Sequence, residues 1–250
     1  MTTAVPSDSS ATGTAQRAFK VLVVDVGGTH VKLLVTGQRV KRQIDSGAKL
    51  TPRQMVAAVK ELTADWNYDV VSVGVPAPVV HGRIVAEPAN LGAGWKRFDF
   101  ARAFGRPTKV INDAAMQALG SYRAGRMLFL GIGTGLGSAL VDHGVVEALE
   151  LAHLPYRKHR TFEDYVGLRG LKRLGKKKWR KHVSAVVDLL RKAMICEDLV
   201  LGGGNAKLLA ELPPGARLGD NANAFKGGFA LWQRAAPATT GRRAPLRAVS

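Results

Sequence analysis

The chain alternates short apolar, β-branched runs with longer stretches in which apolar residues recur at helical spacing. Such runs predict buried strands, and the helical repeat predicts amphipathic helices that cover a sheet. The predicted strands are residues 21–26, 31–35, 70–75, 108–111, 127–132, 138–141 and 199–201. The predicted helices are one that begins after Thr51 with Pro52 in its first turn, and residues 114–122, 163–174, 178–194, 206–212 and 223–232. This alternation is typical of an α/β fold.

The order of these elements divides the chain into two similar halves. A strand, a tight glycine turn and a second strand open the segment 18–115, and the same pattern recurs within the segment 116–222. We therefore expect two α/β domains with a cleft between them, the first completed by a helix over residues 223–234. Residues 1–17 and 235–250 lack a periodic apolar pattern, which predicts two disordered tails.

The first glycine turn contains Asp25, Gly27, Gly28 and Thr29 and joins the first two predicted strands. Adjacent glycines let the backbone approach a ligand and direct successive N–H groups at an anion, and the threonine adds a hydroxyl donor. This predicts a phosphate-binding turn, in which Asp25 holds a Mg²⁺ ion or its water. An ordinary hairpin turn is the alternative.

A second turn, with Gly133, Thr134 and Gly135 at its centre, occupies the matching place in the second half. A strand rather than a helix follows it, so it differs from the dinucleotide-binding fingerprint. Two facing turns of this kind would hold a polyphosphate from both sides of a cleft. Gly203 and Gly204 end a later strand and offer a further place where backbone approaches a phosphate.

Asn112 and Asp113 end a predicted strand immediately before a predicted helix. Sites in α/β proteins form at the carboxyl ends of strands, where an aspartate is able to accept a proton from an attacking hydroxyl. We predict that Asp113 is the general base of a phosphoryl transfer. The alternative is that it only caps the helix.

Polar side chains suited to a sugar lie elsewhere in the chain. Carboxylates and amides select a sugar by hydrogen bonding to its vicinal hydroxyls. The candidates are Asn90, Asn112, Glu150, His153 and Glu163. Each, taken alone, is also compatible with an ordinary surface residue.

The charge of the chain is strongly positive and concentrated. The formal net charge is +18, and residues 157–182 hold eleven Lys and Arg against two acidic residues. Such a concentration favours a polyanion partner over a merely solvated helix face. The expected polyphosphate track is Lys176, Lys177, Lys178, Arg180 and Lys181. Nucleic acid is the less favoured partner, because no aromatic stacking platform or recognition helix is evident.

The amino-acid composition further limits the possible kinds of site and the expected location of the protein. The single cysteine, Cys196, excludes an internal disulfide and a structural zinc site built on clustered thiolates. No run of about 18 apolar residues and no secretory h-region is present, so we expect a cytoplasmic protein without a membrane partner.

Taken in order, the motifs resemble the signature of the ROK sugar kinases. The similarity extends from about residue 21 to residue 232, and within the family the segments 161–167, 170–180 and 202–207 look most like those of polyphosphate glucokinases. The motifs that carry it are Asp25 to Thr29, Gly74 to Val79, Pro88 to Leu91, Asn112-Asp113, Gly131 to Gly137, Glu150 to His153 and Leu201 to Gly204.

The resemblance implies an actin-like ATPase/hexokinase (ribonuclease H-like) fold and a homodimer. It also implies transfer of the terminal phosphoryl of inorganic polyphosphate, in some members of ATP, to the 6-hydroxyl of glucose with Mg²⁺ and without zinc. Asp113 would then be the base, and the residues named above the sugar and phosphate contacts. Ala77 and Ala152 stand where the family usually has glycine, so the hexose stays open between glucose and mannose. An ATP-dependent sugar kinase and a non-catalytic polyanion-binding protein are the alternative functions.

Overall fold

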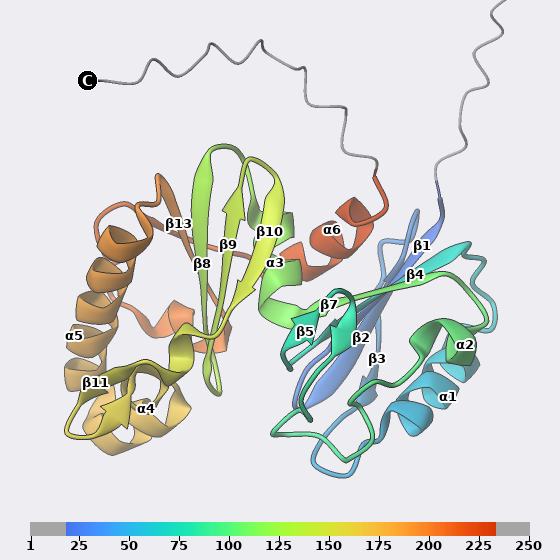
Figure 1. Cartoon of the computed structure of the whole chain (residues 1–250), viewed down its shortest axis with the longest axis horizontal. Helices are drawn as coiled ribbons and strands as arrows, with labels where there is room; N and C mark the ends of the chain where they lie inside the picture. The colour runs from blue at the N-terminus through green and yellow to red at the C-terminus, as the bar shows by residue number, and fades with distance from the viewer. Residues whose placement is uncertain (1–18, 234–250) are drawn as a thin grey trace, which may run out of the picture.

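The computed structural model describes residues 19–233, which form two α/β halves side by side (Figure 1). Each half contains a five-stranded mixed sheet, so the predicted α/β class with two similar halves is confirmed. The predicted tails lie outside the described residues. Within residues 19–233, no helix has the length and apolar character needed to cross a membrane.

The first sheet begins with the predicted hairpin and continues into parallel strands. Its strands are β1 (Val21–Val26), β2 (His30–Val35), β3 (Arg42–Asp45), β4 (Val70–Val75) and β7 (Thr108–Asn112). Their order is β3-β2-β1-β4-β7, with antiparallel pairing from β3 to β1 and parallel pairing from β1 to β7. The carboxyl ends of β1, β4 and β7 therefore meet at one edge of the sheet.

Helix α1 (Pro52–Leu62) begins where the sequence predicts. The Thr51 hydroxyl accepts a hydrogen bond from the Gln54 N–H at 3.3 Å, and the Gln54 side chain accepts one from the Thr51 N–H at 3.0 Å. This capping box satisfies donors that the first helical turn leaves free. The buried face of α1, including Met55 and Val59, packs against the first sheet.

The second sheet repeats the hairpin and then adds parallel strands. Its strands are β8 (Arg126–Ile132), β9 (Leu136–Asp142), β10 (Val145–Leu149), β13 (Asp198–Gly202) and β14 (Ala216–Leu218). Their order is β10-β9-β8-β13-β14. The hairpin strands are antiparallel, and β13 pairs parallel with both β8 and β14.

Helices α4 (Phe162–Val166) and α5 (Leu168–Met194) pack against the second sheet (Figure 1). The predicted boundary between residues 163–174 and 178–194 is confirmed: within α5 two helices meet at a kink at Gly175, whose φ +70° and ψ 160° are not helical and are accessible to glycine without strain. A second break, at Gly167 between α4 and α5, was not predicted. Trp179 is buried after the kink, and its indole N–H donates to the Val166 carbonyl at 2.8 Å.

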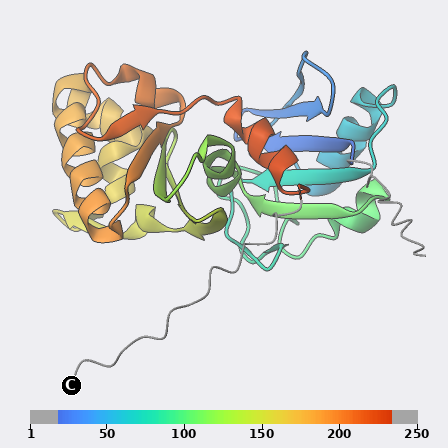
Figure 2. The ribbon, with the colours of Figure 1, turned by 90° about the horizontal axis from the view of Figure 1, so that it is seen from above.

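Two helices lie side by side between the sheets, α3 (Asp113–Ser121) and α6 (Asn223–Ala230) (Figure 2). Their backbones approach closely because the contact is made by glycines: a Cβ at Gly120 would lie 2.6 Å from the Gly227 nitrogen. The Ser72 hydroxyl on β4 donates to the Gly228 carbonyl at 2.7 Å. The last described helix thus returns to the first sheet.

Several short elements were not predicted from the sequence, or were predicted as another type of element. The predicted helix 206–212 is a short 3₁₀ helix, η2 (Gly204–Leu208), because Pro213 and Pro214 favour extended backbone before them. Strand β3 is largely exposed and lacks the apolar run that marks a strand. Strand β10 was also not predicted, although four of its five residues are apolar. The remaining short elements are β5 (Val79–Val80), β6 (Arg83–Ile84), α2 (Phe100–Phe104), η1 (Leu151–His153), β11 (Pro155–Arg157) and β12 (Arg160–Thr161).

Candidate active site

A cavity of about 880 Å³ lies between the two halves. Its walls combine carboxylate, amide and imidazole side chains with small residues, which suits a polyhydroxylated ligand. We name it the acceptor cavity. The residues predicted from sequence that line it are Asn90, Asn112, Asp113, Glu150, His153 and Glu163, together with Ala77 and Ala152.

A second cavity of about 440 Å³ adjoins the first and is lined by glycine turns from both halves. We name it the donor cavity. Eight of the nine residues predicted to bind phosphate line it, namely Asp25, Gly27, Gly28, Thr29, Gly133, Thr134, Gly203 and Gly204. The ninth, Gly135, lines the acceptor cavity instead. Gly28, Asp113, Gly133, Thr134 and Gly203 line both cavities, so the two spaces meet along these residues.

Asp113 stands at this junction, where β7 ends and α3 begins. The capping role belongs to its neighbour, because the Asn112 Oδ1 accepts from the Ala115 N–H at 3.1 Å. The Asn112 amide also donates to the Ala77 carbonyl at 3.2 Å, which fixes the end of β7 against the loop after β4. The Oδ1 of Asp113 accepts a hydrogen bond from the Ala114 N–H at 2.8 Å. This bond to the first turn of α3 orients the carboxyl group.

The electrostatics of the junction favour a group that exchanges protons near neutral pH. Burial raises the pKa of Asp113 to about 7, with a further contribution from the negative charge of Asp25. Burial also raises the pKa of Asp25 to about 6, and the positive charge of Lys32 opposes this increase. General bases are effective when their pKa lies near the working pH.

The two phosphate turns are held in place by backbone contacts. In the first turn, the Gly27 N–H donates to the His30 carbonyl at 3.0 Å. In the second, the Gly133 N–H donates to the Gly135 carbonyl at 3.1 Å, and the Asn205 side-chain amide donates to the Gly133 carbonyl at 2.8 Å. Fixed turns keep their N–H groups directed at one place, as anion binding requires.

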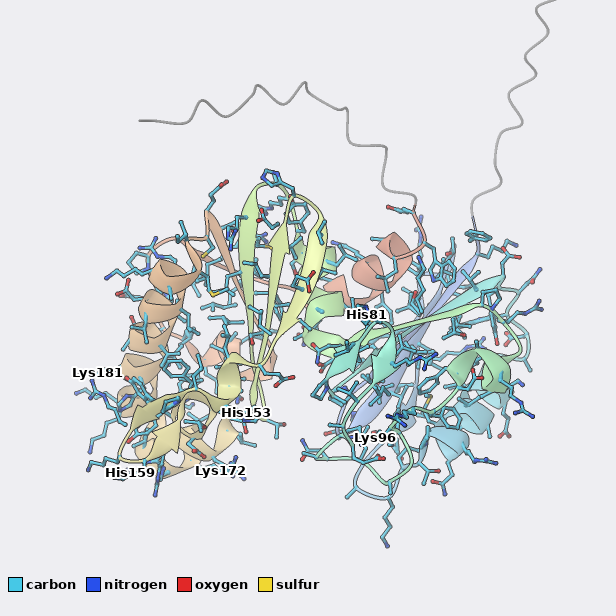
Figure 3. The ribbon with its side chains drawn as sticks, in the orientation of Figure 1. His81, Lys96, His153, His159, Lys172 and Lys181 are labelled. Carbon is cyan, nitrogen blue, oxygen red and sulfur yellow. The ribbon has the colours of Figure 1, made fainter. Side chains whose placement is uncertain are left out.

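The polar wall of the acceptor cavity is also organised. Glu163 Oε2 accepts from the Leu136 N–H at 3.2 Å, while its Oε1 accepts from the Arg169 guanidinium at 3.2 Å. Glu150 and His153 lie on either end of η1, with a carboxylate oxygen 3.6 Å from the imidazole Nε2. His153 is placed beside the space between the halves (Figure 3).

The family model for the ROK family matches residues 21–147. The chain belongs to the ROK family. The match extends from β1 into β10 and therefore includes both glycine turns and Asp113.

Curated relatives of this ROK protein include glucokinases, some of which carry polyphosphate in their names. The polyphosphate glucokinase of Mycobacterium leprae is 25% identical over 84% of this chain and 69% of the relative. That of Mycobacterium tuberculosis H37Rv is 26% identical over 82% of this chain and 84% of the relative. The glucokinase of Pyrobaculum calidifontis is 29% identical, but the matched region spans 54% of this chain and 49% of that enzyme.

Solved structures show the same fold at low identity. An inorganic polyphosphate/ATP-glucomannokinase from Arthrobacter sp. strain KM matches with a TM-score of 0.74 and 22% identity, over 86% of this chain and 98% of that one. A ROK hexokinase from Thermus thermophilus matches with a TM-score of 0.61 and 21% identity, over 84% and 97%. The ROK protein described here thus has the actin-like ATPase fold predicted from its motifs.

The predicted polyphosphate track lies on α5 beyond the two cavities. Lys176, Lys177, Lys178 and Lys181 are exposed, and Lys181 lies on the side of the second half away from the first half (Figure 3). Arg180 is half-buried, and its Nε donates to the Leu208 carbonyl at 2.7 Å, so part of its guanidinium is occupied within the fold. None of these five residues lines either cavity.

Several lining residues escaped the sequence analysis. Gln117 lines both cavities, one helical turn after Asp113 on the same face of α3, a spacing that identifies it once Asp113 is chosen. Lys32 lines the donor cavity, and Arg169 and Lys172 line the acceptor cavity. Lys32 was missed because the candidate chemistry near it was assigned to the glycine motif around Gly27. Arg169 and Lys172 were missed because the basic signal was assigned to the denser run 176–178.

Magnesium is the metal that the donor cavity suits. Mg²⁺ takes oxygen ligands and is usually held by one or two carboxylates together with substrate phosphates and water. Asp25 and Asp113 supply two carboxylates on the wall of one cavity. Within residues 19–233 there is no cluster of three or more His, Cys, Asp or Glu that could hold a metal ion.

Proposed function

We propose that the protein is a polyphosphate-dependent glucokinase that transfers the terminal phosphoryl group of inorganic polyphosphate to the 6-hydroxyl of glucose. The observation that carries the proposal is the position of Asp113, which lines both the cavity with sugar-binding chemistry and the cavity walled by glycine turns. A base at this junction reaches an acceptor hydroxyl on one side while a phosphoryl group is presented from the other.

In this reaction Asp113 accepts the proton of the 6-hydroxyl while the hydroxyl oxygen forms a bond to the terminal phosphorus. The bond from that phosphorus to the bridging oxygen breaks, and the shortened polyphosphate leaves with the bonding electron pair. Phosphoryl transfer depends mainly on alignment and on stabilising charge, so a well-placed base and donor-rich turns meet most of its needs.

The two turns hold the donor, and the polar wall orients the sugar. The N–H groups of the two turns other than those of Gly27 and Gly133, which donate within the turns, would bind the terminal phosphates, and Glu150, His153 and Glu163 would bind hydroxyls. Asp25 would hold Mg²⁺, which neutralises charge on the phosphates when it is bound, and Asp113 stays free to accept the proton. Because the cavity opens between two halves, closure around both substrates would exclude water and limit hydrolysis of the donor.

Charge favours polyphosphate over ATP as the donor. Beyond the donor cavity, α5 presents exposed Lys176, Lys177, Lys178 and Lys181, which suits a polyanion longer than a nucleotide triphosphate. The polyphosphate glucokinases among the relatives extend over most of this chain and support the same donor. ATP is the second candidate, because Asn205 and Asn221 line the donor cavity and offer amides for a nucleoside.

The test is formation of glucose 6-phosphate by the purified protein with Mg²⁺ and glucose, comparing long-chain polyphosphate with ATP. We expect faster turnover with polyphosphate, and loss of about 10² to 10⁴ in rate in Asp113→Asn. Glu61→Gln, on an exposed side chain outside both cavities, is the matched control. Turnover with ATP alone would replace polyphosphate by ATP in the proposal, and inactivity with both donors on glucose and on mannose would refute it.

Mannose is included because Ala77 and Ala152 are both buried in the acceptor wall. Each methyl group restricts the space beside the sugar, so the ratio of glucose to mannose turnover measures their effect on selectivity. The homodimer stays a prediction, which sedimentation of the purified protein would test.

A further inference from the structure

The loop that carries Asn90 has no regular secondary structure. It follows β6 and precedes α2, and Asn90 lines the acceptor cavity. A Cβ at Gly28 of the first phosphate turn would lie 3.7 Å from the Asn90 Cβ, so Asn90 stands close to that turn. Its side-chain amide takes part in none of the hydrogen bonds found within residues 19–233 and is free to bind a ligand. In an exposed loop, such an amide keeps one position only if other contacts fix the backbone around it.

Glu87 makes contacts of this kind at the start of the loop. Its Oε2 accepts a hydrogen bond from the Trp95 N–H at 3.0 Å, and its Oε1 accepts one from the Lys96 N–H at 3.2 Å. Hydrogen bonds to a charged acceptor are stronger than those between neutral groups. A single carboxylate thus joins the two ends of the loop, with Asn90 between them.

The far end of this loop is attached to the core of the first half. Trp95 is fully buried, and its indole N–H donates to the Leu50 carbonyl at 3.1 Å. The Gly92 N–H donates to the same carbonyl at 3.0 Å. Trp95 is therefore a fixed point, and Glu87 ties to it the segment that leads into Asn90.

We propose that Glu87 is a positioning residue, whose two hydrogen bonds to the loop backbone place the Asn90 amide against the hydroxyls of the sugar. This rests on the proposed function, because it assigns a role within the same acceptor site. Glu87 itself lines the acceptor cavity, but both of its oxygens already accept backbone N–H groups. Its effect on the sugar is therefore exerted through Asn90.

The first test compares the kinetics of Glu87→Ala, Glu87→Gln and Glu61→Ala, with glucose and whichever of polyphosphate and ATP the wild type uses. Glu61 is exposed on α1 and lies outside both cavities. We expect Glu87→Ala to raise the KM for glucose about tenfold, because small displacements of a binding group remove much of its effect, with little change in kcat or in the KM for the donor. Glu87→Gln should raise it less, since its amide oxygen still accepts one N–H. Glu61→Ala should match the wild type.

An unchanged KM for glucose in Glu87→Ala would overturn the inference. A role for the negative charge of Glu87 predicts instead that Glu87→Ala and Glu87→Gln alter the KM for the anionic donor equally. A purely structural role predicts a lower melting temperature without a selective change in the KM for glucose, so melting temperatures are measured on the same proteins.

The second test asks whether Glu87 acts through Asn90. In an Asn90→Ala background, Glu87→Ala should raise the KM for glucose by about twofold or less, because the amide that Glu87 positions is already absent. The same factor in both backgrounds would mean that Glu87 acts independently of Asn90, which would overturn the inference.

Two further readouts do not need turnover. Hydrogen exchange at the Trp95 and Lys96 amides should be faster in Glu87→Ala than in the wild type, and equal rates would show that Glu87 does not hold the loop. Glucose should raise the melting temperature of the wild type and of Glu61→Ala more than that of Glu87→Ala. If the wild type binds glucose in this way but is inactive with every donor, the proposed function fails and the melting temperatures decide the role of Glu87. An active wild type with equal increases in all variants would overturn the inference alone, and a wild type that neither binds nor phosphorylates glucose or mannose would overturn both.

Discussion

Asp113 and Asp25 place two carboxyl groups on the wall of one cavity, and the negative charge of Asp25 helps to raise the pKa of Asp113. Burial is the larger cause, and the result is a pKa of about 7 for Asp113. Asp25 lies on β1 and Asp113 directly follows β7, and these two strands lie two positions apart in the first sheet and end at the same edge. The parallel strands thus bring the two carboxyl groups together, and this proximity contributes to a pKa that suits a proton acceptor at neutral pH.

The first prediction concerns the pH dependence of the reaction. A base works in its deprotonated form, so with a pKa of about 7 for Asp113 the value of kcat/KM should fall as pH decreases below 7, by about tenfold per pH unit. A divalent cation beside the carboxyl groups moves this decrease to lower pH. Initial rates from pH 5 to pH 9 at fixed free Mg²⁺ measure it, and a rate that rises below pH 6 would contradict Asp113 as the base.

The second prediction concerns the stability of the metal-free protein and follows from the same raised pKa of Asp113. Between the unfolded pKa of 3.8 and the folded pKa of about 7, the folded state binds the proton of Asp113 more tightly than the unfolded state does. The stability that this proton contributes is present at low pH and is lost as pH rises towards 7. Asp113→Asn does not titrate, so its free energy of unfolding should gain on that of the wild type between pH 5 and pH 8.

The relative gain is at most about 3 kcal/mol, since one pKa unit corresponds to about 1.4 kcal/mol and Asp113 retains some contact with solvent in the cavity. Urea unfolding in EDTA at the two pH values measures it. Glu61→Gln removes an exposed carboxylate outside both cavities and should track the wild type at both pH values. A constant difference between Asp113→Asn and the wild type would show that Asp113 titrates normally.

The third prediction concerns the exposed lysines of α5. Lys176, Lys177 and Lys178, replaced together by alanine, should raise the KM for long-chain polyphosphate roughly tenfold or more, with little change for tripolyphosphate or ATP. The effect should weaken as ionic strength increases, because salt screens exposed charges. Lys41, Lys49 and Lys226 are also exposed and lie outside both cavities, so their triple alanine variant removes the same charge as a control. Equal increases in KM for all donors would refute the prediction that these lysines form a polyphosphate track.

Much of the site could be predicted from sequence because its chemistry sits in contiguous motifs at the ends of strands. Strong apolar runs gave β1, β4 and β8, and each strand end then located a turn or a carboxylate such as Asp25. A strand end is a local property of the chain. Both the glycine turns and Asp113 were therefore within reach of sequence patterns.

The features that were not predicted from the sequence depend on strand pairing and on side-chain orientation. Lys32 is distinguished from other lysines only by standing opposite Asp25 across a hairpin, which requires the register. Arg180 carries the same charge as its neighbours in the sequence, yet its guanidinium is turned towards Leu208. The break at Gly167 was missed because the apolar spacing continues from α4 into α5, and a periodic pattern does not report backbone angles.

The last prediction concerns the contact of α3 with α6, which joins the helix that carries Asp113 to the first sheet. A methyl group at Gly120 would overlap the carbonyl oxygen of Asn223 and one at Gly227 would overlap that of Met116, so the helices would have to separate. Gly120→Ala and Gly227→Ala should each destabilise the protein by roughly 1–3 kcal/mol or more, since backbone cannot move aside as a side chain does. Gly133→Ala is the matched control for stability, because its methyl group would meet no heavy atom within 4 Å. Chemical unfolding of the three variants makes the comparison, and wild-type stability in both helix variants would mean that α3 and α6 do not pack through these glycines.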